Sequence, residues 1–178
     1  MSILTKSEIE KLIKATPPLV QGYLDLKTQL QPNGIDLTLK EIARFKTAGK
    51  LTVDNSQRVI SELELLPFDK DGFIDLKPFR ENLQGEPGAY LVTFNETVNL
   101  PDDLTALGQP RSSLLRCGVN IGTAVWDAGY SGRSQSLLTV HNPLGFRLER
   151  NARILQLIFF RLGGRTAGYK GRYQGENT

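Results

Sequence analysis

The sequence predicts an all-β protein that begins with one short helix. Short runs of β-branched and aromatic residues alternate with turn signals along the chain, and 17 of the 178 residues are glycine. Many short strands separated by turns are typical of a β-barrel or a β-sandwich. The chain shows neither an internal repeat nor a low-complexity linker, so we expect a single domain spanning residues 1–178.

The expected helix lies at the beginning of the chain, in residues 1–20. Thr5-Lys6-Ser7-Glu8 has the form of a capping box, and Ile9, Leu12 and Ile13 follow at helical spacing. Pro17-Pro18 then provides a stop. The spacing predicts one helix of about ten residues.

After this helix the hydrophobic pattern changes to that of strands. Turn signals such as Pro32-Asn33-Gly34, Asp71-Gly72, Glu86-Pro87-Gly88 and Asn142-Pro143 separate the apolar runs. Residues 46–86 are the least regular part, where we expect a long loop or a peripheral hairpin. The clearest expected strands are 34–39, 89–94, 137–141 and 154–160.

The composition excludes several kinds of chemistry. One cysteine, Cys117, permits no intrachain disulfide, and with His141 as the only histidine the chain cannot supply a zinc site of three or four Cys and His ligands. A Ser-His-Asp hydrolase would depend on His141 alone. The chemistry must therefore use carboxylates, hydroxyls, arginines and the backbone, with or without a metal that is not held by a Cys and His cage.

No apolar run approaches the ~20 residues of a membrane helix. Charged residues interrupt positions 1–19, so no secretory signal is expected either. With the low cysteine content, this favours a soluble, cytoplasmic protein without a membrane partner.

Positive charge gathers at the C-terminal end of the chain. The formal net charge is +3, but residues 144–178 hold seven Arg and Lys against two Glu, a local +5. This distribution favours a short phosphate chain as partner more than a long polyanion such as a nucleic acid. A solvated tail is the alternative.

The segment Pro110-Arg-Ser-Ser-Leu-Leu-Arg116 is a candidate anion site. Two arginines and two serines stand within six residues, and guanidinium groups pair well with phosphate oxygens. Arg111 and Arg116 would point to opposite faces of a regular strand, whereas a strand that runs into a helical turn could bring both to one site. An ordinary turn is the alternative interpretation.

Asp127 is informative because it is isolated. It is the only Asp or Glu from Leu104 to Leu148, and it follows the apolar run Ala124-Val125-Trp126 and precedes Ala-Gly-Tyr-Ser-Gly. A carboxylate at a strand end can accept a proton from a bound water. The alternative is a structural aspartate in an Asx-turn or a helix N-cap. We interpret Trp126 as a packing residue.

Five segments together resemble the deoxyuridine triphosphatase (dUTPase) and dCTP deaminase superfamily, most closely the archaeal-type dUTPases. They occur in the order of the family's motifs and cover most of the chain. The segments are Gln31-Pro-Asn-Gly-Ile-Asp-Leu-Thr-Leu39, Pro110-Arg-Ser-Ser-Leu-Leu114, Val125-Trp-Asp-Ala-Gly-Tyr-Ser-Gly132, Ala152-Arg-Ile-Leu-Gln-Leu-Ile158 and Tyr169-Lys-Gly-Arg-Tyr-Gln-Gly175.

The resemblance implies a distorted, jelly-roll-like β-barrel that forms a homotrimer with active sites between subunits. Residues 163–178 would be a C-terminal arm that closes over the nucleotide. The activity would be hydrolysis of dUTP to dUMP and pyrophosphate, which limits uracil in DNA and supplies dUMP for thymidylate synthesis. Family members use Mg²⁺ held mainly by the triphosphate, so no direct protein ligand is expected, with contact through water to Asp127 or Asp36.

The resemblance also implies roles for individual residues. Asp127 would position and activate the water that attacks the α-phosphorus, Ser112 would lie near the α–β bridging oxygen, and Tyr130 would pack against the deoxyribose and exclude a 2′-hydroxyl. Backbone groups of a hairpin at 118–125 would read uracil. The other substrate contacts would be Arg111, Ser113, Arg116, Asn120, Thr123, Ala124, Gln156, Tyr169, Lys170, Arg172, Tyr173 and Gln174.

Two alternatives remain open at this stage. A dCTP deaminase, or a bifunctional deaminase and dUTPase, needs a glutamate on the strand after the third motif, where counting reaches Leu137 or Thr139. Gln135 stands where close relatives are expected to carry Glu, and the C-terminal arm resembles that of the deaminases. The second alternative is a nucleotide-binding module without catalysis.

Overall fold

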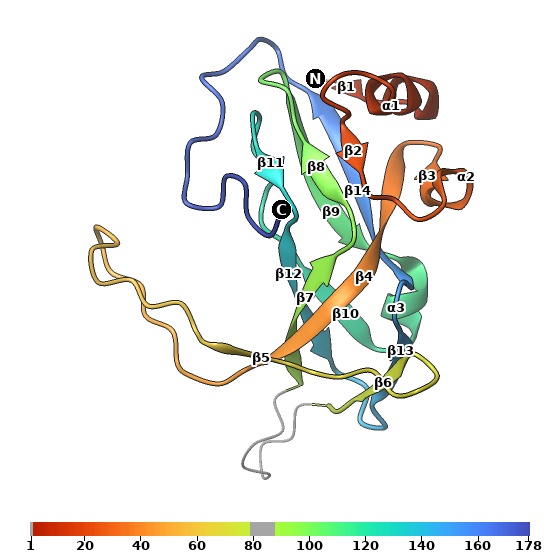
Figure 1. Ribbon diagram of the computed structural model, residues 1–178, viewed down its shortest axis with the longest axis vertical. Helices are drawn as coiled ribbons and strands as arrows, with labels where there is room; N and C mark the ends of the chain where they lie inside the picture. Colours follow the sequence, from red (N-terminus) through yellow and green to blue (C-terminus); the bar gives the residue numbers. More distant parts are fainter. Residues whose placement is uncertain (1, 79–87) are drawn as a thin grey trace.

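The computed structural model describes residues 2–78 and 88–178, and its centre is a curled antiparallel sheet that forms half of a barrel (Figure 1). Six strands form the main path in the order β1-β14-β4-β7-β12-β10. Strands β3 and β5 add to β4, and β9 adds to β14. Two small sheets, β11-β8-β2 and β13-β6, flank it. The fold confirms the all-β prediction.

The bounds of the elements in the first half of the chain are β1 Ser2–Ile3, α1 Lys6–Ile13, β2 Val20–Gln21, α2 Leu26–Gln29, β3 Leu30–Gln31, β4 Gly34–Phe45, β5 Leu63–Leu65, β6 Phe73–Leu76 and β7 Ala89–Phe94. Those in the second half are β8 Thr97–Asn99, β9 Leu104–Pro110, α3 Ser112–Arg116, β10 Val119–Gly122, β11 Ser131–Gly132, β12 Gln135–Val140, β13 Phe146–Glu149 and β14 Arg153–Arg161.

Helix α1 begins at the expected capping box. The N–H of Thr5 donates to Oε2 of Glu8 at 2.9 Å, and the N–H of Glu8 donates back to Oγ1 of Thr5 at 3.4 Å. Ile9 and Ile13 are buried against the sheet. The helix ends at Ile13, before the two prolines, so the helix prediction is confirmed.

The four expected strands are present as β4, β7, β12 and β14. Strand β4 is longer than expected, because a register shift between Leu39 and Glu41 lets it continue along β7 and then pair with β5. Residues 46–62 form a projecting hairpin in which Lys50 bridges Val59. The last part of the expected irregular segment, 79–87, lies outside the described residues.

Of two features near the expected motifs, the first differs from the sequence-based expectation, and the second is the strand followed by a helical turn that was considered for Arg111 and Arg116. The segment 118–125 is not a hairpin of its own: β10 pairs with β12, so residues 123–134 form the long connection between the two strands. The segment after Pro110 runs from strand β9 directly into the single helical turn α3. The prediction of a hairpin at 118–125 was wrong, because β10 forms its backbone hydrogen bonds with β12, which lies outside this segment.

One continuous cluster of buried apolar side chains lies inside the curled sheet. Strand β4 crosses its middle and is buried on both faces, so that Asp36 and Thr38 are buried together with Ile35, Leu37 and Leu39. Buried polar groups need hydrogen-bond partners, and β4 therefore organises the polar network described below. In residues 2–78 and 88–178 no helix has the length and apolar character to cross a membrane.

Candidate active site

Asp127 lies on the rim of a cavity of about 190 Å³. Its position is fixed by the preceding residue, because the backbone of Trp126 exchanges two hydrogen bonds with Ala106 of β9, at 3.0 and 3.1 Å. The side chain of Asp127 is exposed, and no described residue donates a hydrogen bond to its carboxylate. The lining residues are Ala124, Val125, Trp126, Asp127, Tyr130, Ser134, Gln135, Tyr169, Tyr173 and Glu176.

This geometry argues against the alternative in which Asp127 is a structural aspartate of an Asx-turn or a helix N-cap. A capping or Asx-turn aspartate uses its carboxylate to accept a nearby backbone N–H. In this turn the N–H of Tyr130 donates to the backbone carbonyl of Asp127 instead, at 3.1 Å. The Asp127 carboxylate is thus available to a water or a ligand in the cavity.

Tyr130 forms one wall of the cavity. Its ring forms a T-shaped pair with that of Tyr169 at a centroid distance of 5.9 Å, and its hydroxyl donates to Oε1 of Glu176 at 2.9 Å. Burial, followed by the hydrogen bond to Glu176, raises the pKa of Tyr130, so the phenol remains a proton donor. Trp126 is buried and donates from Nε1 to Oγ of Ser134, as expected for a packing residue.

The C-terminal arm, residues 163–178, lies along β11 of the same chain. The N–H of Gly175 donates to the Ser131 carbonyl at 2.8 Å, and Nε2 of Gln174 donates to the Gly129 carbonyl at 3.1 Å. Gly129 has φ +81°, and a Cβ there would stand 2.6 Å from Cα of Gly168, so only glycine lets the arm approach this closely.

The predicted phosphate-binding residues lie at another place. Ser112, Ser113 and Arg116 are exposed on α3 and do not line the cavity. Ala106, beside Trp126, and Ser112 are separated by the extended run of β9, six residues or about 20 Å. Figure 1 shows α3 and β11 on opposite sides of the sheet. Within one chain Ser112 and Asp127 therefore cannot both contact one phosphorus atom.

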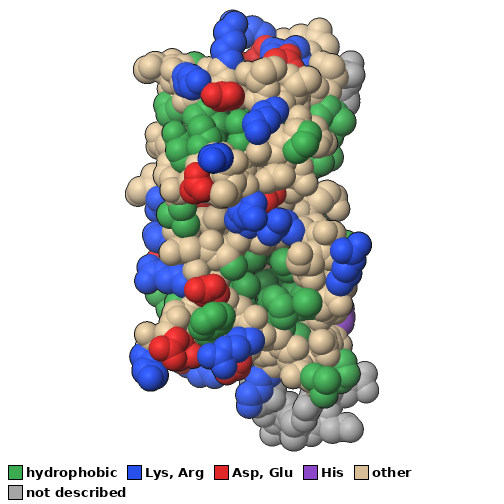
Figure 2. All heavy atoms as spheres, turned by 90° about the vertical axis from the view of Figure 1, so that its right-hand side faces the viewer, with side chains coloured by type: hydrophobic (Ala, Val, Ile, Leu, Met, Phe, Trp, Pro, Cys, Tyr) green, Lys and Arg blue, Asp and Glu red, His purple; other side chains and the backbone are tan. Residues whose placement is uncertain are grey.

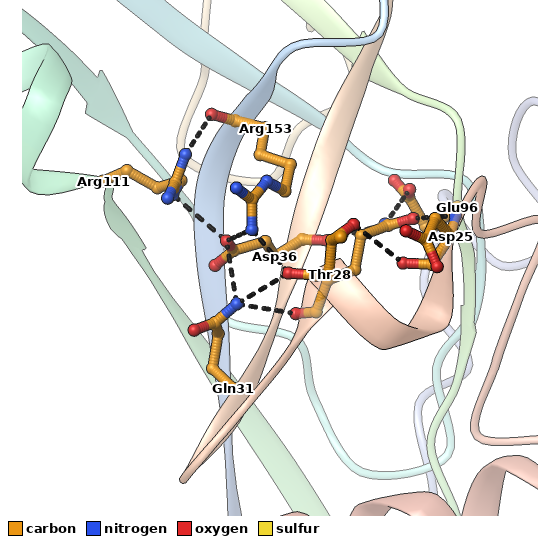
Figure 3. A network of polar contacts seen from close by, with 8 residues as sticks. Asp25, Thr28, Gln31, Asp36, Glu96, Arg111 and Arg153 are labelled. Carbon is orange, nitrogen blue, oxygen red and sulfur yellow. Dashed lines mark hydrogen bonds and ion pairs between the residues drawn. The ribbon is translucent and has the colours of Figure 1, made fainter.

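Arg111 is engaged in a buried ion-pair network (Figure 3). Its Nε lies 3.1 Å from Oδ2 of Asp36, which also contacts NH1 of Arg153 at 3.3 Å and Nε2 of Gln31 at 3.3 Å. Asp36 is 2% exposed. Burial raises the pKa of Asp36, while Arg111 and then Arg153 oppose the rise. The network joins β4, β14 and the start of α3.

A second buried carboxylate continues the same network toward β8. Oε1 of Glu96 accepts from Gln29 at 2.7 Å and from the hydroxyl of Thr38 at 2.6 Å, and its Oε2 accepts from the N–H of Thr38 at 2.9 Å. Burial raises the pKa of Glu96 against these hydrogen bonds. This fully buried group is structural and lies outside the cavity lining.

The remaining predicted contacts are dispersed. Asn120 is exposed on β10, Thr123 donates from Oγ1 to the Gly108 carbonyl at 3.4 Å, and Gln156 is half-buried on β14 opposite Asp36. Lys170 and Arg172 are exposed on the arm. The cavity brings together five of the predicted residues: Ala124, Asp127, Tyr130, Tyr169 and Tyr173.

Sequence reasoning missed Glu176 as a residue of the cavity. The signal was available, because Glu176 is the only acidic residue after Glu149, and isolation had already singled out Asp127. Gln135 was noted only as a departure from relatives, but it lines the cavity, with Nε2 donating to Oγ1 of Thr93 at 3.0 Å.

The cavity offers few ligands for a metal. Across the described part of the chain, no three His, Cys, Asp or Glu side chains gather to hold an ion. Asp127 is one free carboxylate at the rim. Such a donor set fits a Mg²⁺ ion that brings phosphate and water as most of its ligands, since Mg²⁺ commonly binds proteins through one or two carboxylates.

A curled antiparallel sheet with a tyrosine-walled cavity, one free carboxylate and a C-terminal arm folded over it defines a small-molecule-binding β protein. Sequence comparison gives its family. The chain belongs to the dCTP deaminase-like family, which it matches over residues 3–162.

Curated relatives extend along the whole chain. It is 51% identical to a "Probable deoxyuridine 5'-triphosphate nucleotidohydrolase" of Methanosarcina mazei, over 100% of this chain and 99% of the relative. A protein with the same name from Archaeoglobus fulgidus is 46% identical over 99% of this chain and 98% of its own length. The match to archaeal proteins of this name confirms the expected resemblance.

A solved structure supports the fold. The 2'-deoxycytidine 5'-triphosphate deaminase of Agrobacterium tumefaciens superposes with a TM-score of 0.64 at 22% identity, over 90% of this chain and 48% of that one. At this identity the likeness concerns the arrangement of the strands.

Proposed function

We propose that this chain hydrolyses dUTP to dUMP and pyrophosphate. The observation that carries the proposal is the free carboxylate of Asp127 on the rim of a cavity walled by Tyr130. Full-length identity near 50% to proteins named as deoxyuridine 5'-triphosphate nucleotidohydrolases supports the same substrate.

The reaction needs one water and one base. Asp127 accepts a proton from the water while the water oxygen bonds to the α-phosphorus, and the bond from that phosphorus to the α–β bridging oxygen breaks. Pyrophosphate leaves with the electron pair of the broken bond. Tyr130 would contact the deoxyribose face, where a protonated phenol beside the sugar leaves little room for a 2′-hydroxyl.

Mg²⁺ would arrive with the triphosphate and stabilise the charge that develops on the leaving pyrophosphate. Asp127 would hold it through a coordinated water. We favour Asp127 over Asp36 for this contact, because the Asp36 carboxylate is buried and already accepts from Arg111, Arg153 and Gln31.

The separation of Ser112 from Asp127 supports a site that is completed by a second copy of the chain. About 20 Å of strand lies between the two ends, so Ser112, Ser113 and Arg116 would serve the Asp127 of a neighbouring subunit. A homotrimer with three equivalent sites is the assembly that we propose, because cyclic symmetry repeats one such contact around a closed ring.

Deamination of dCTP is the alternative activity, and the cavity does not favour it. Along β12 the face that contributes Gln135 to the cavity also carries Leu137 and Thr139, and none of these is a carboxylate. The likeness to the deaminase structure concerns the fold alone. We therefore expect no release of ammonia from dCTP.

A nucleic-acid-binding module is also disfavoured. Three arginines of the basic C-terminal region are ion-paired within the chain: Arg147 with Asp69, Arg153 with Asp36 and Arg161 with Asp103. On the face drawn in Figure 2, Lys and Arg side chains are scattered among acidic and hydrophobic ones without forming a stripe. An exposed free thiol at Cys117 suits the cytoplasmic location that we propose.

One incubation separates these activities. The chain is supplied with Mg²⁺ and, in parallel, with dUTP, dCTP, dTTP or UTP, and both pyrophosphate and ammonia are measured. We expect pyrophosphate from dUTP, little from the other three nucleotides and no ammonia. Ammonia from dCTP would restore the deaminase alternative, and no product from any nucleotide would favour a binding module.

A further inference from the structure

Glu176 occupies an unusual place for an acidic residue. It lines the same cavity as Asp127, although a site for a nucleoside triphosphate gains nothing from a second negative charge. Its carboxylate is half-buried and accepts the hydroxyl of Tyr130 at 2.9 Å. Burial raises the pKa of Glu176, while the Tyr130 hydrogen bond opposes the rise. The presence of the Glu176 carboxylate in the cavity is therefore best explained by its hydrogen bond with Tyr130.

Two contacts and one glycine fix the phenol of Tyr130. Glu176 accepts from its hydroxyl, Tyr169 packs on its ring in a T-shaped pair, and Gly132 leaves room for the phenol oxygen. A Cβ at position 132 would stand 2.7 Å from the Tyr130 oxygen and 3.3 Å from Cγ of Glu176. Gly132 thus accommodates both members of the pair at once.

The backbone next to and at Glu176 is held by residues 131–133, directly after Tyr130. Its carbonyl accepts the N–H of Arg133 at 2.9 Å, and the neighbouring Gly175 N–H donates to Ser131 at 2.8 Å. The carboxylate can therefore reach the phenol only while the C-terminal arm is docked on β11. Docking of the arm is therefore coupled to the orientation of the Tyr130 ring.

We propose that Glu176 is a positioning residue that locks the phenol of Tyr130 when the C-terminal arm docks, and so sets discrimination between deoxyribose and ribose. The inference rests on the proposed function, in which Tyr130 faces the sugar. A locked ring presents a fixed wall to a 2′-hydroxyl, whereas a ring that can rotate admits it. Selectivity thereby depends on an arm residue that need not touch the nucleotide.

The test compares the ratio of kcat/KM for dUTP to that for UTP in four variants. Glu176→Ala and Tyr130→Phe should each lower the ratio about tenfold, the effect of losing one hydrogen bond of ordinary strength. The double variant should lose no more than either single variant, because both remove the same contact. Glu176→Gln keeps an acceptor oxygen and should hold the ratio within about twofold of the wild type.

Asn177→Gly is the matched control. It removes a hydrogen bond of the arm, from Nδ2 of Asn177 to the Arg133 carbonyl, and glycine tolerates the φ of 54° found there. This variant keeps the backbone hydrogen bonds of Gly175 and Glu176 that dock the arm and the Tyr130–Glu176 contact, so the dUTP to UTP ratio should be unchanged. The proposal is overturned if Glu176→Ala keeps the wild-type ratio, or if Asn177→Gly lowers it equally.

Amide hydrogen exchange without nucleotide makes the contact testable apart from the activity. Tyr130→Phe and Glu176→Ala should both reduce protection of the Gly175 amide about tenfold. Unchanged protection in Tyr130→Phe would overturn the proposed lock. If the wild-type chain hydrolyses neither nucleotide, the proposed function fails while the exchange result still decides whether the phenol holds the arm.

Discussion

At the scale of single residues, the carboxylates of Asp127 and Glu176 differ in exposure and in hydrogen bonding. Asp127 is exposed and accepts no hydrogen bond from the described residues, whereas Glu176 is half-buried and accepts the Tyr130 hydroxyl. A free carboxylate can take a proton from water, and a bound one can orient its partner. The two acidic side chains of the cavity therefore have separate tasks in our account.

Replacing Asp127 with Asn tests the first task. The amide keeps the shape of the side chain but cannot accept the proton, so we expect dUTP hydrolysis to fall by on the order of 1,000-fold while binding is retained. Trp126 is the only tryptophan and lines the cavity, so its fluorescence reports nucleotide binding in both proteins. Hydrolysis at the wild-type rate in Asp127→Asn would rule out the proposed base.

At the scale of elements, strand β4 shows how buried polar groups shape the site. Asp36 of this strand pairs with Arg111 at the start of α3 (Figure 3), and Thr38, two residues further on, donates to Glu96 before β8. The strand thus connects α3, the predicted phosphate-binding turn, to Glu96 directly before β8, which pairs with β11. Both carboxylates are buried, so their hydrogen bonds must all be satisfied.

Glu96→Gln measures what this network contributes to stability. Both oxygens of Glu96 accept hydrogen bonds, and an amide nitrogen in place of one of them would face another donor. We expect the free energy of unfolding to fall by about 1–3 kcal/mol in urea denaturation. The exposed Glu149→Gln on β13 is the control, with a change within about 0.5 kcal/mol. An unchanged midpoint in Glu96→Gln would contradict this role.

Local features of the fold could be predicted from the sequence, and distant contacts could not. The Thr5 capping box and the strands of alternating or continuous apolar residues are encoded within a few positions. The Tyr130–Glu176 contact joins residues 46 positions apart, and the pairing of Arg153 with Asp36 joins β14 to β4. Such pairs depend on which strands become neighbours, which no local pattern specifies.

The distribution of charge also shows that distant contacts cannot be predicted from the sequence alone. The basic excess of residues 144–178 favours phosphate as a partner when the sequence is considered alone, but three of its arginines pair with aspartates from distant parts of the chain. Asp127 was found from its isolation, a property of the sequence alone. The same criterion applied to the arm would have found Glu176.

At the scale of the whole molecule, the proposed site is divided. Asp127, Tyr130 and the arm lie at one end of the curled sheet, and α3 with Ser112 lies at the other (Figure 1). The fold cannot bring these ends together, because strand β9 holds them apart. In the proposed site, Ser112 of one copy therefore meets Asp127 of another.

Complementation between two inactive variants tests this claim most directly. Ser112→Ala and Asp127→Asn should each lose dUTP hydrolysis by on the order of 100-fold or more when expressed alone. In a homotrimer formed from an equal mixture, about a quarter of the sites would join an intact Asp127 to an intact Ser112, and about a quarter of the wild-type rate should return.

Mixing Asp127→Asn with the Ser112→Ala/Asp127→Asn double variant is the control, since none of its sites has an intact base. Pyrophosphate release from dUTP is measured in each mixture after co-expression. We predict recovery near one quarter in the first mixture and none in the second. A first mixture that is no more active than either variant alone would contradict the shared site.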